Sequence, residues 1–308
     1  MKFNKHALFI LVVLCGICGG SIPAFAKIAL ESFNPGTLIL LRYIFTLVFL
    51  IIFFSWGKRV INWRNVKLTL PVSVFAAVNA ITFAIGISHV KASAVALLYN
   101  VVPLMVALLS WIILKERMTW SKIVGLLIGF IGVMVVALAP YLGKAQNLDF
   151  QLIGAVVIFI GALGFSLYSV LSKPVQDKVT PGEILIGSSI VILACQAVYM
   201  LVTTEPFSIA SASWRSWGAV LEIFFIGTVL FYGLFQYILK ASSPTAAASM
   251  TYVQPAAGAL WAMAVLGDRL SLVSLIGGLI SLIGVAQVHG LWNDVSKKLS
   301  RNQANLLK

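Results

Sequence analysis

Long apolar stretches alternate with short polar or Pro/Gly-containing breaks along almost the whole chain. A bilayer core about 30 Å thick needs about 20 apolar residues per helix, and stretches of that length recur throughout. We therefore predict ten transmembrane helices, near residues 7–30, 36–56, 68–89, 92–114, 120–140, 151–172, 182–203, 216–239, 244–266 and 271–292. The breaks at 89–91 and 241–243 are very short, so the number of helices is better determined than their ends.

The chain repeats part of its own pattern at an offset of 152 residues. Residues 92–136 align with residues 244–288 without a gap, and 15 of the 45 aligned pairs are identical. These pairs include proline with proline, arginine with arginine and glycine with glycine, which apolar composition alone would not place in one register. A weaker match at an offset of 146 pairs Lys27 with Lys173 and relates the first predicted helix to the sixth.

The two offsets divide the chain into a first repeat at 1–140, a second repeat at 141–292 and a tail at 293–308. Each repeat contains five predicted helices, and an odd number of crossings makes the second repeat enter the membrane in the opposite sense. The predicted fold is therefore an all-α integral membrane protein whose ten transmembrane helices form two inverted five-helix repeats. Residues 1–26 resemble a cleavable secretory signal, but they complete the first repeat, so we expect no cleavage.

Composition and charge fit this interpretation. The chain is 60% hydrophobic and 10% charged, with a mean hydropathy of +1.02, and too few polar groups exist to cover a soluble globule. The net charge of +13 comes from short clusters between apolar stretches and forms no basic helix face, so nucleic acid is not an expected partner. With the N-terminus inside, 16 of the 22 Lys and Arg residues fall on cytoplasmic segments, as the resistance of positive loops to translocation requires. We expect a multi-pass protein of the cell inner membrane with both termini cytoplasmic.

One motif closes both the fourth and the ninth predicted helices. Pro103 is followed by LKERMT at residues 114–119, and Pro255 by LGDRLS at residues 266–271. With these paired motifs the chain resembles the drug/metabolite transporter superfamily, and within it the ten-span EamA-type permeases, over almost its whole length. The resemblance implies a transporter, while substrates in the family range over amino acids, other metabolites, nucleotide derivatives and drugs.

The acid–arginine pairs of this motif are candidate gates. Glu116 and Arg117 lie at one membrane face, and Asp268 and Arg269 at the other. Each acid can pair locally or cap the next helix. Two roles stay open: a gate that opens on one side at a time, or a structural corner that orients two helices.

Pro103 and Pro255 lie about halfway along the fourth and ninth predicted helices, where each should remove a backbone hydrogen bond and bend its helix. We predict hinges there. Amides and phenols at bilayer depth should face protein or water, so those near the prolines and on neighbouring helices are expected either to line a substrate cavity or only to join helices. The candidates are Asn79, Thr82, Tyr99, Asn100, Tyr168, Gln236, Tyr252 and Gln254.

Small residues recur at helical spacing in the fifth and tenth predicted helices. They permit close approach of helix backbones in lipid, which predicts that these helices fasten the two halves together or support a dimer. We expect a monomer, with a homodimer as the alternative. The residues are Gly125, Gly129, Gly132, Gly277, Ser281 and Gly284.

Charges inside the predicted helices are few. Arg42 is the most deeply placed cation and is expected to pair with Glu31 or another acid, as a structural ion pair or as a gate. A carboxylate at the midplane, which would couple proton and cationic-drug binding, is not obvious; Glu222 is the acid that comes closest. This argues against proton-driven export of cationic drugs.

We therefore expect a secondary transporter that moves a small neutral or zwitterionic metabolite, such as an amino acid, by alternating access, with export preferred. The alternatives are an uptake or exchange carrier for a nucleotide derivative or S-adenosylmethionine and, from another class, a non-transporting membrane scaffold or receptor. An enzyme is not expected, because His6, His89 and His289 lie at helix ends without a nucleophile or metal motif. No cofactor or metal is predicted, and the expected partners are the substrate and the lipid bilayer.

Overall fold

The computed structural model describes residues 4–57, 61–89, 99–138, 152–204, 206–207, 209, 212–267 and 272–291. All regular secondary structure in these residues is helical. The α-helices are α1 (Lys5–Ala29), α2 (Pro35–Trp56), α3 (Trp63–His89), α5 (Val102–Leu114), α6 (Trp120–Leu138), α7 (Leu152–Ser172), α8 (Pro181–Thr203), α9 (Trp214–Phe224), α10 (Phe231–Ala241), α11 (Pro244–Ala248), α12 (Gln254–Leu266) and α13 (Leu272–Val288).

Six helical segments among the described residues are long and apolar enough to cross a bilayer. They are α1, α2, the Trp63–Gly86 part of α3, Val156–Val175, α8, and Trp214–Ala241. The apolar helices α5, α6 and α13 are shorter. A multi-pass membrane protein follows from these segments, while the full set of ten crossings stays a prediction.

Two predicted helices contain irregular turns. The segment Trp214–Ala241 runs through a π-helical turn at Phe225–Leu230 between α9 and α10. Between α11 and α12 the chain forms a 3-10 turn at Ser249–Tyr252. Such turns interrupt the regular i to i−4 hydrogen-bond pattern and are frequent at functional sites.

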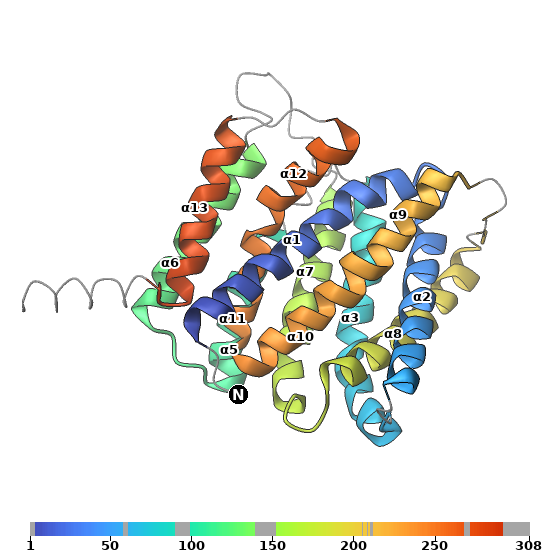
Figure 1. Ribbon diagram of the computed structural model, residues 1–308, viewed down its shortest axis with the longest axis horizontal. Coiled ribbons are helices and arrows are strands. Elements are labelled where there is room, and N and C mark those ends of the chain that lie inside the picture. Colours follow the sequence, from blue (N-terminus) through green and yellow to red (C-terminus); the bar gives the residue numbers. More distant parts are fainter. Residues whose placement is uncertain are drawn as a thin grey trace, which may run out of the picture.

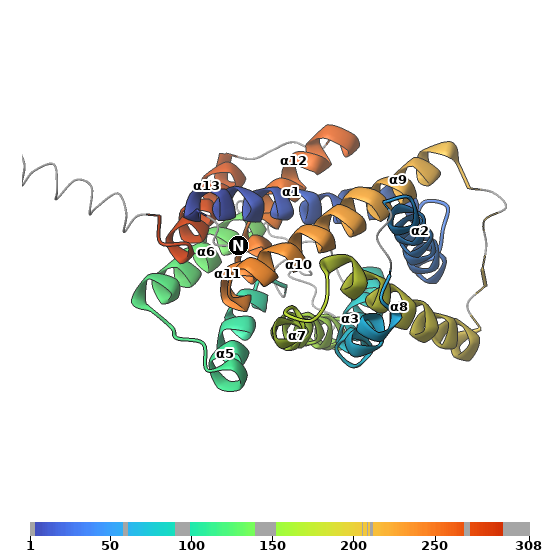
Figure 2. The same ribbon diagram turned by 60° about the horizontal axis from the view of Figure 1, so that its bottom comes forward.

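The helix contacts keep their pattern when the two halves of the chain are exchanged. In the two halves, α1 is equivalent to α7, α3 to the segment α9–α10, and α5 to α12. α3 packs on α7, and correspondingly α9 and α10 pack on α1. α5 packs on α7, and correspondingly α12 packs on α1. The pairs α2 with α8 and α6 with α13 join equivalent helices of the two halves. Figures 1 and 2 both show α6 and α13 at one end of the molecule and α2 and α8 toward the other. The helices are thus arranged as two similar halves.

α6 and α13 approach each other at backbone distance along the predicted small residues. A Cβ atom added to Gly284 would lie 2.2 Å from the Gly129 nitrogen, and one added to Gly132 would lie 2.3 Å from the Ser281 nitrogen. A Cβ on Gly277 would meet the Gly132 carbonyl oxygen at 2.7 Å. The small-residue faces therefore meet each other within one chain, between the two halves.

Short polar residues begin several of the helices. The Asn34 side chain accepts a hydrogen bond from the Thr37 backbone N–H at 2.7 Å, directly before Pro35 opens α2. Thr180 and Glu183 form a reciprocal capping box at the start of α8. Such caps satisfy backbone N–H groups that have no partner inside the helix.

Candidate functional site

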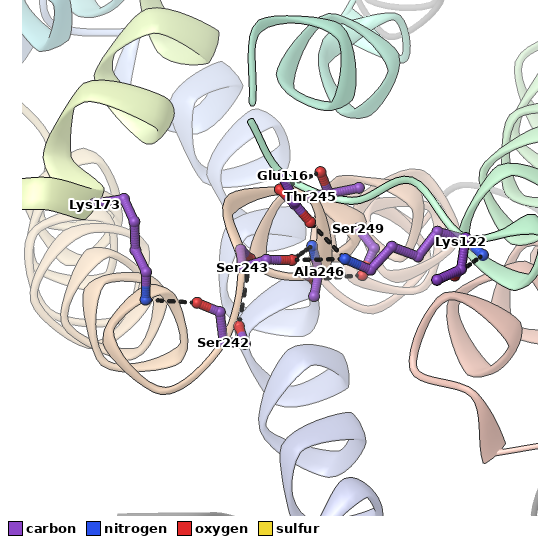
Figure 3. A network of polar contacts seen from close by, with 9 residues as sticks. Glu116, Lys122, Lys173, Ser242, Ser243, Thr245, Ala246 and Ser249 are labelled. Carbon is purple, nitrogen blue, oxygen red and sulfur yellow. Dashed lines mark hydrogen bonds and ion pairs between the residues drawn. The ribbon is translucent and has the colours of Figure 1, made fainter. Parts of the chain in front are cut away.

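A network of polar side chains joins the two halves at the end of the molecule where α1 begins. The Glu116 carboxylate, in the α5–α6 connection, accepts from Lys122 Nζ at 2.6 Å and from Thr245 Oγ1 of α11 at 2.9 Å. Lys122 also donates to Ser243 Oγ at 3.4 Å. Figure 3 shows these side chains meeting between the start of α6 and the start of α11. We call Glu116, Lys122, Ser243 and Thr245 the polar latch.

A second lysine extends the network to the sixth predicted helix. Lys173 Nζ, directly after α7, donates to the backbone carbonyls of Leu239 at 2.8 Å and Ser242 at 2.7 Å. Ser242 and Ser243 are neighbours in the chain, so the contacts run from α7 through the α10–α11 connection to α6 (Figure 3). Four predicted helices are held together at this end.

Glu116 stays charged in the latch. Burial by itself raises the pKa of this carboxyl group, but the hydrogen bonds from Lys122, Ser243 and Thr245 and the charge of Lys122 outweigh burial and lower the pKa below its ordinary value. The Glu116 side chain is only 9% exposed, against 21% for Lys122. A desolvated carboxylate is stabilised in its charged form when a cation and a hydroxyl group donate hydrogen bonds to it.

A small cavity lies in the half of the bundle where α1 ends. Its volume is about 50 Å³. It is bounded by the second half of α1, the first half of α2, α3 and α9, and it reaches Leu30 directly after α1 and Pro35 at the start of α2. Arg42 and Tyr43 are the polar residues of its wall. The other wall residues are apolar and include Ile22, Ala26, Leu38, Ile39, Ala80, Phe83, Ala84 and Ile223.

Arg42 contacts neutral groups. Its Nε donates to Thr228 Oγ1 at 2.5 Å and its Nη2 to the Gly227 carbonyl oxygen at 2.9 Å, and the guanidinium lies 5.2 Å from the Tyr43 ring centroid. No carboxylate lies within ion-pair distance among the residues that the structure describes. The expected pairing with Glu31 is therefore wrong, while the acids Glu205 and Asp268 lie outside the described residues. The reason is the π-helical turn, which contains both Gly227 and Thr228 and presents polar atoms that a regular helix would keep in its own hydrogen bonds.

A buried chain of hydrogen bonds joins several helices of the bundle. Tyr168 Oη lies 3.0 Å from Ser188 Oγ and accepts from Gln236 Nε2 at 2.7 Å. Gln176 continues the chain by donating to Gln236, and Ser73 lies 3.2 Å from Ser188. These five side chains come from α3, α7, α8, α10 and the connection after α7, and all are buried. The predicted residues Tyr168 and Gln236 thus meet in one network.

Three other predicted residues meet between α3 and α7. The Asn79 amide donates to the Tyr99 hydroxyl group and, at 2.9 Å, to the Gly161 carbonyl oxygen. Thr82 donates to the Val78 carbonyl oxygen in its own helix at 2.7 Å. The amide of Asn79 therefore joins two helices, while the Thr82 hydroxyl is used inside one.

The remaining predicted residues lie near the two prolines. Asn100 and Tyr252 occupy equivalent positions of the two repeats; both are buried, and the Asn100 Nδ2 and Tyr252 Oη atoms have no hydrogen-bond partner among the described residues. Gln254 Nε2 lies 3.9 Å from Met250 Sδ. The eight predicted substrate residues are thus spread over several places, and none of them lines the cavity.

The prolines stand in the first turns of helices. Pro103 is in the first turn of α5 and Pro255 in that of α12, where a proline removes no hydrogen bond. The expectation that Pro255 bends a continuous helix is therefore wrong: the helix is already interrupted by the 3-10 turn Ser249–Tyr252. A hinge role at these sites stays a prediction.

The helix-end motif is resolved in the first repeat. Glu116 pairs with Lys122, whereas Arg117 is exposed. The cap of α6 is Thr119, whose hydroxyl accepts from the Lys122 backbone N–H at 3.4 Å. The second copy, Asp268 and Arg269, lies outside the described residues.

The comparison with models of known protein families identifies one family. A model of the EamA-like transporter family matches residues 7–138 and 152–289. The chain belongs to the EamA-like transporter family. It is 23% identical over 269 residues to an uncharacterized transporter from Archaeoglobus fulgidus, with 84% of this chain and 90% of that protein covered. A solved crystal structure has the same fold, with a TM-score of 0.76 at 18% identity over 96% of this chain and 99% of the other.

Membership in the EamA-like family makes this chain a membrane transporter built on a two-repeat architecture. The sequence identified Arg42 as a deep cation and Glu222 as the deepest acid, but not their surroundings. It missed Tyr43, Gln176 and Ser188. The adjacent hydroxyl groups of Ser188 and Ser189 in the apolar stretch 184–195 were the signal that could have pointed to the polar chain.

Proposed function

We propose that this chain is a secondary transporter that moves a small neutral or zwitterionic metabolite, such as an amino acid, across the inner membrane by alternating access, in the direction of export. The observation that carries the proposal is the contrast between the two sides of the bundle. One side is joined by the polar latch, and the other contains the cavity beside Arg42.

The exchange pattern of helix contacts supports alternating access. In a molecule made of two inverted halves, each contact that closes one side has a counterpart able to close the other. The α1–α12 and α5–α7 contacts form such a pair. The latch joins the first repeat to the second through Glu116 and Thr245, so its opening would release one half from the other on that side only.

The lysine and arginine pattern supports an orientation. Positive segments stay in the cytoplasm, and the latch end carries Lys115, Arg117 and Lys122. We infer that the latch faces the cytoplasm, that both termini are cytoplasmic and that the cavity belongs to the outward side.

Counterflow in proteoliposomes tests this proposal. Vesicles loaded with one unlabelled amino acid should transiently accumulate the same labelled amino acid from outside, because an alternating-access carrier exchanges solute across both faces. Protein-free liposomes are the first control. The Gly218→Ala variant, at an exposed position with open space around it, is a matched protein control. Absence of counterflow for every amino acid in a panel of apolar, polar and charged members would contradict the proposal.

A further inference from the structure

A second, larger groove lies between α5 and α6, at the connection that contains Glu116. Its volume is about 240 Å³, and all of its lining side chains are apolar. They are Leu104, Ala107, Leu108, Trp111, Met118, Ile123, Leu126 and Leu127. The α5 members recur at spacings of three and four residues, as do the α6 members, so each helix turns one apolar stripe toward the groove. The groove therefore runs along both helices.

The two helices that form the groove have their main partners elsewhere. α5 packs on α7 and α11, and α6 packs on α13. Within the described residues, only α5, α6 and their connection form the wall of the groove. Figures 1 and 2 both show this connection at the edge of the bundle. A molecule from the surroundings can therefore complete the packing between α5 and α6.

The surroundings of the groove are apolar as well. Leu108 and Trp111 are 55% and 56% exposed, and Ile112 and Ile113 of the same helix are also exposed. In a membrane transporter such an exposed apolar surface lies against lipid. Unfilled space along this wall would leave its atoms without dispersion contacts, and lipid tails, which are as apolar as leucine, can supply those contacts. The chemistry of the wall thus favours an acyl chain as the occupant.

Two cations mark one end of the groove. Lys115 caps the C-terminus of α5, and Arg117 directly precedes the groove residue Met118. Both side chains are exposed, and neither forms an ion pair with a described residue. Trp120, the first residue of α6, is 80% exposed, and tryptophan is enriched at the level of the lipid headgroups. The two cations therefore lie where the hydrocarbon part of a bound lipid ends and its phosphate begins.

We propose that the groove between α5 and α6 binds an anionic phospholipid, whose acyl chain lies between the two apolar stripes and whose phosphate group is bound by Lys115 and Arg117. Basic pockets between transmembrane helices bind anionic headgroups in this way. The site goes beyond the proposed transport function and does not depend on which solute is carried.

Native mass spectrometry of the purified full-length protein tests the site with two lipids that have the same acyl chains. Dioleoyl phosphatidylglycerol carries a net negative charge, whereas dioleoyl phosphatidylcholine is zwitterionic. Two cations should make the first phosphatidylglycerol bind about 10- to 30-fold more tightly than phosphatidylcholine. Equal affinity for the two lipids would overturn the proposal without any variant.

Paired substitutions then locate the headgroup. The double variant Lys115→Gln, Arg117→Gln should lose most of the preference for phosphatidylglycerol. The double variant Arg64→Gln, Lys67→Gln is the matched control, because it removes the same charge at two exposed cations of α3 that do not line the groove. It should keep the preference of the wild type. An equal loss in the two double variants would show a response to overall charge and overturn the site.

A larger side chain in the groove tests the position of the acyl chain. Leu108→Trp should weaken binding of both lipids about tenfold, the equivalent of roughly two methylene groups left unburied. Ile112→Trp is the control, since Ile112 is exposed on the same helix but does not line the groove. Unchanged lipid affinity in a Leu108→Trp protein that elutes as a single species would contradict this position.

Tryptophan fluorescence tests the same position without enlarging any side chain. Phosphatidylglycerol with brominated acyl chains quenches tryptophans that it contacts, so the fluorescence lost on its addition should be smaller in Trp111→Phe than in the wild type. An equal loss in both proteins would overturn the site. A lipid-free dimer that Leu108→Trp abolishes would assign the groove to a second copy of the chain and would also overturn it.

Discussion

The charges in the polar latch and in the cavity beside Arg42 have opposite surroundings. In the latch, Glu116 has a lysine and a threonine as partners. In the cavity wall, Arg42 meets neutral groups and pairs with no carboxylate of the described chain. A charge that the protein pairs with an opposite charge holds helices together, whereas a charge without such a partner is available to a ligand. We infer that the presence of protein partners, more than depth in the bundle, separates structural charges from charges that are available to a ligand.

The largest expected effect is a loss of stability at the α6–α13 contact, outside both regions. It shows how large an effect is when only packing is disrupted. Gly284→Leu places a side chain where the Gly129 backbone nitrogen lies 2.2 Å from an added Cβ, and backbone atoms between two helices cannot move aside. We expect a loss of about 3 kcal/mol, with little folded protein recovered. Fluorescence-detected size-exclusion chromatography measures the yield, with Gly218→Leu as the control at an open position. Normal yield of Gly284→Leu would contradict the close α6–α13 packing.

Glu116→Gln should open the latch without changing the cavity beside Arg42. The change replaces a charge-assisted contact with Lys122 by a neutral one and should cost the latched state about 1 to 2 kcal/mol, a roughly tenfold shift in population. In a background without Cys15, Cys18 and Cys195, a cysteine replacing the buried Ser249 reports opening through its rate of reaction with a water-soluble maleimide.

We expect that rate to rise about tenfold in Glu116→Gln. The exposed neighbour Arg117 provides the control, since Arg117→Gln should leave the rate unchanged. A labelling rate that is equal in Glu116→Gln and the wild type would show that the latch does not hold this side closed.

The acid stability of the latch follows from the lowered pKa of Glu116. A carboxyl group with a lowered folded-state pKa contributes stability that is fully present above its unfolded value of 4.5 and is lost as pH falls through the folded value. The melting temperature of the wild type should therefore exceed that of Glu116→Gln by a constant amount above about pH 5.5 and by a shrinking amount below it. A difference that grows on acidification would contradict the assignment.

The smallest expected effect is at a buried polar side chain that has no hydrogen-bond partner among the described residues and is expected to have no role in binding. Gln196 of α8 is 1% exposed and neither atom of its amide has a partner among the described residues, but it does not line the cavity. Gln196→Leu should leave L-leucine binding unchanged and raise stability by up to about 1 kcal/mol, because it removes an unsatisfied amide. Thermal unfolding in the presence and absence of L-leucine measures both quantities. Loss of binding in this variant would extend the site to α8.

The sequence predicts those parts of the fold that depend on local pattern. The predicted helix at 36–56 corresponds to α2 at Pro35–Trp56, and the predicted helix at 182–203 corresponds to α8 at Pro181–Thr203. These bounds agree because a proline begins each helix and polar residues come directly after its end. α3 begins earlier than predicted, at Trp63, because its first turn is polar and hydropathy alone does not detect it. The glycine spacing predicted the α6–α13 contact for a direct reason: a missing side chain has the same consequence in any sequence context.

The arrangement of the candidate site was harder to predict from the sequence than the fold. Asn79, Tyr168 and Gln236 were expected either to line a cavity or only to join helices, and the structure shows that each has a partner on another helix. Which polar groups find partners depends on helix rotation, which hydropathy does not determine. The partners of Arg42 depend on the π-helical turn, and that turn packs against α1 and α2, which lie far from it in the sequence.

The most direct test of the account compares L-leucine binding to Arg42→Gln and Glu116→Gln by isothermal titration calorimetry under identical conditions. The account predicts that Arg42→Gln binds about 10- to 100-fold more weakly than the wild type, while Glu116→Gln stays within about threefold because its charge already has protein partners. Retained affinity in Arg42→Gln together with lost affinity in Glu116→Gln would contradict the account, since the satisfied charge would then be the binding one.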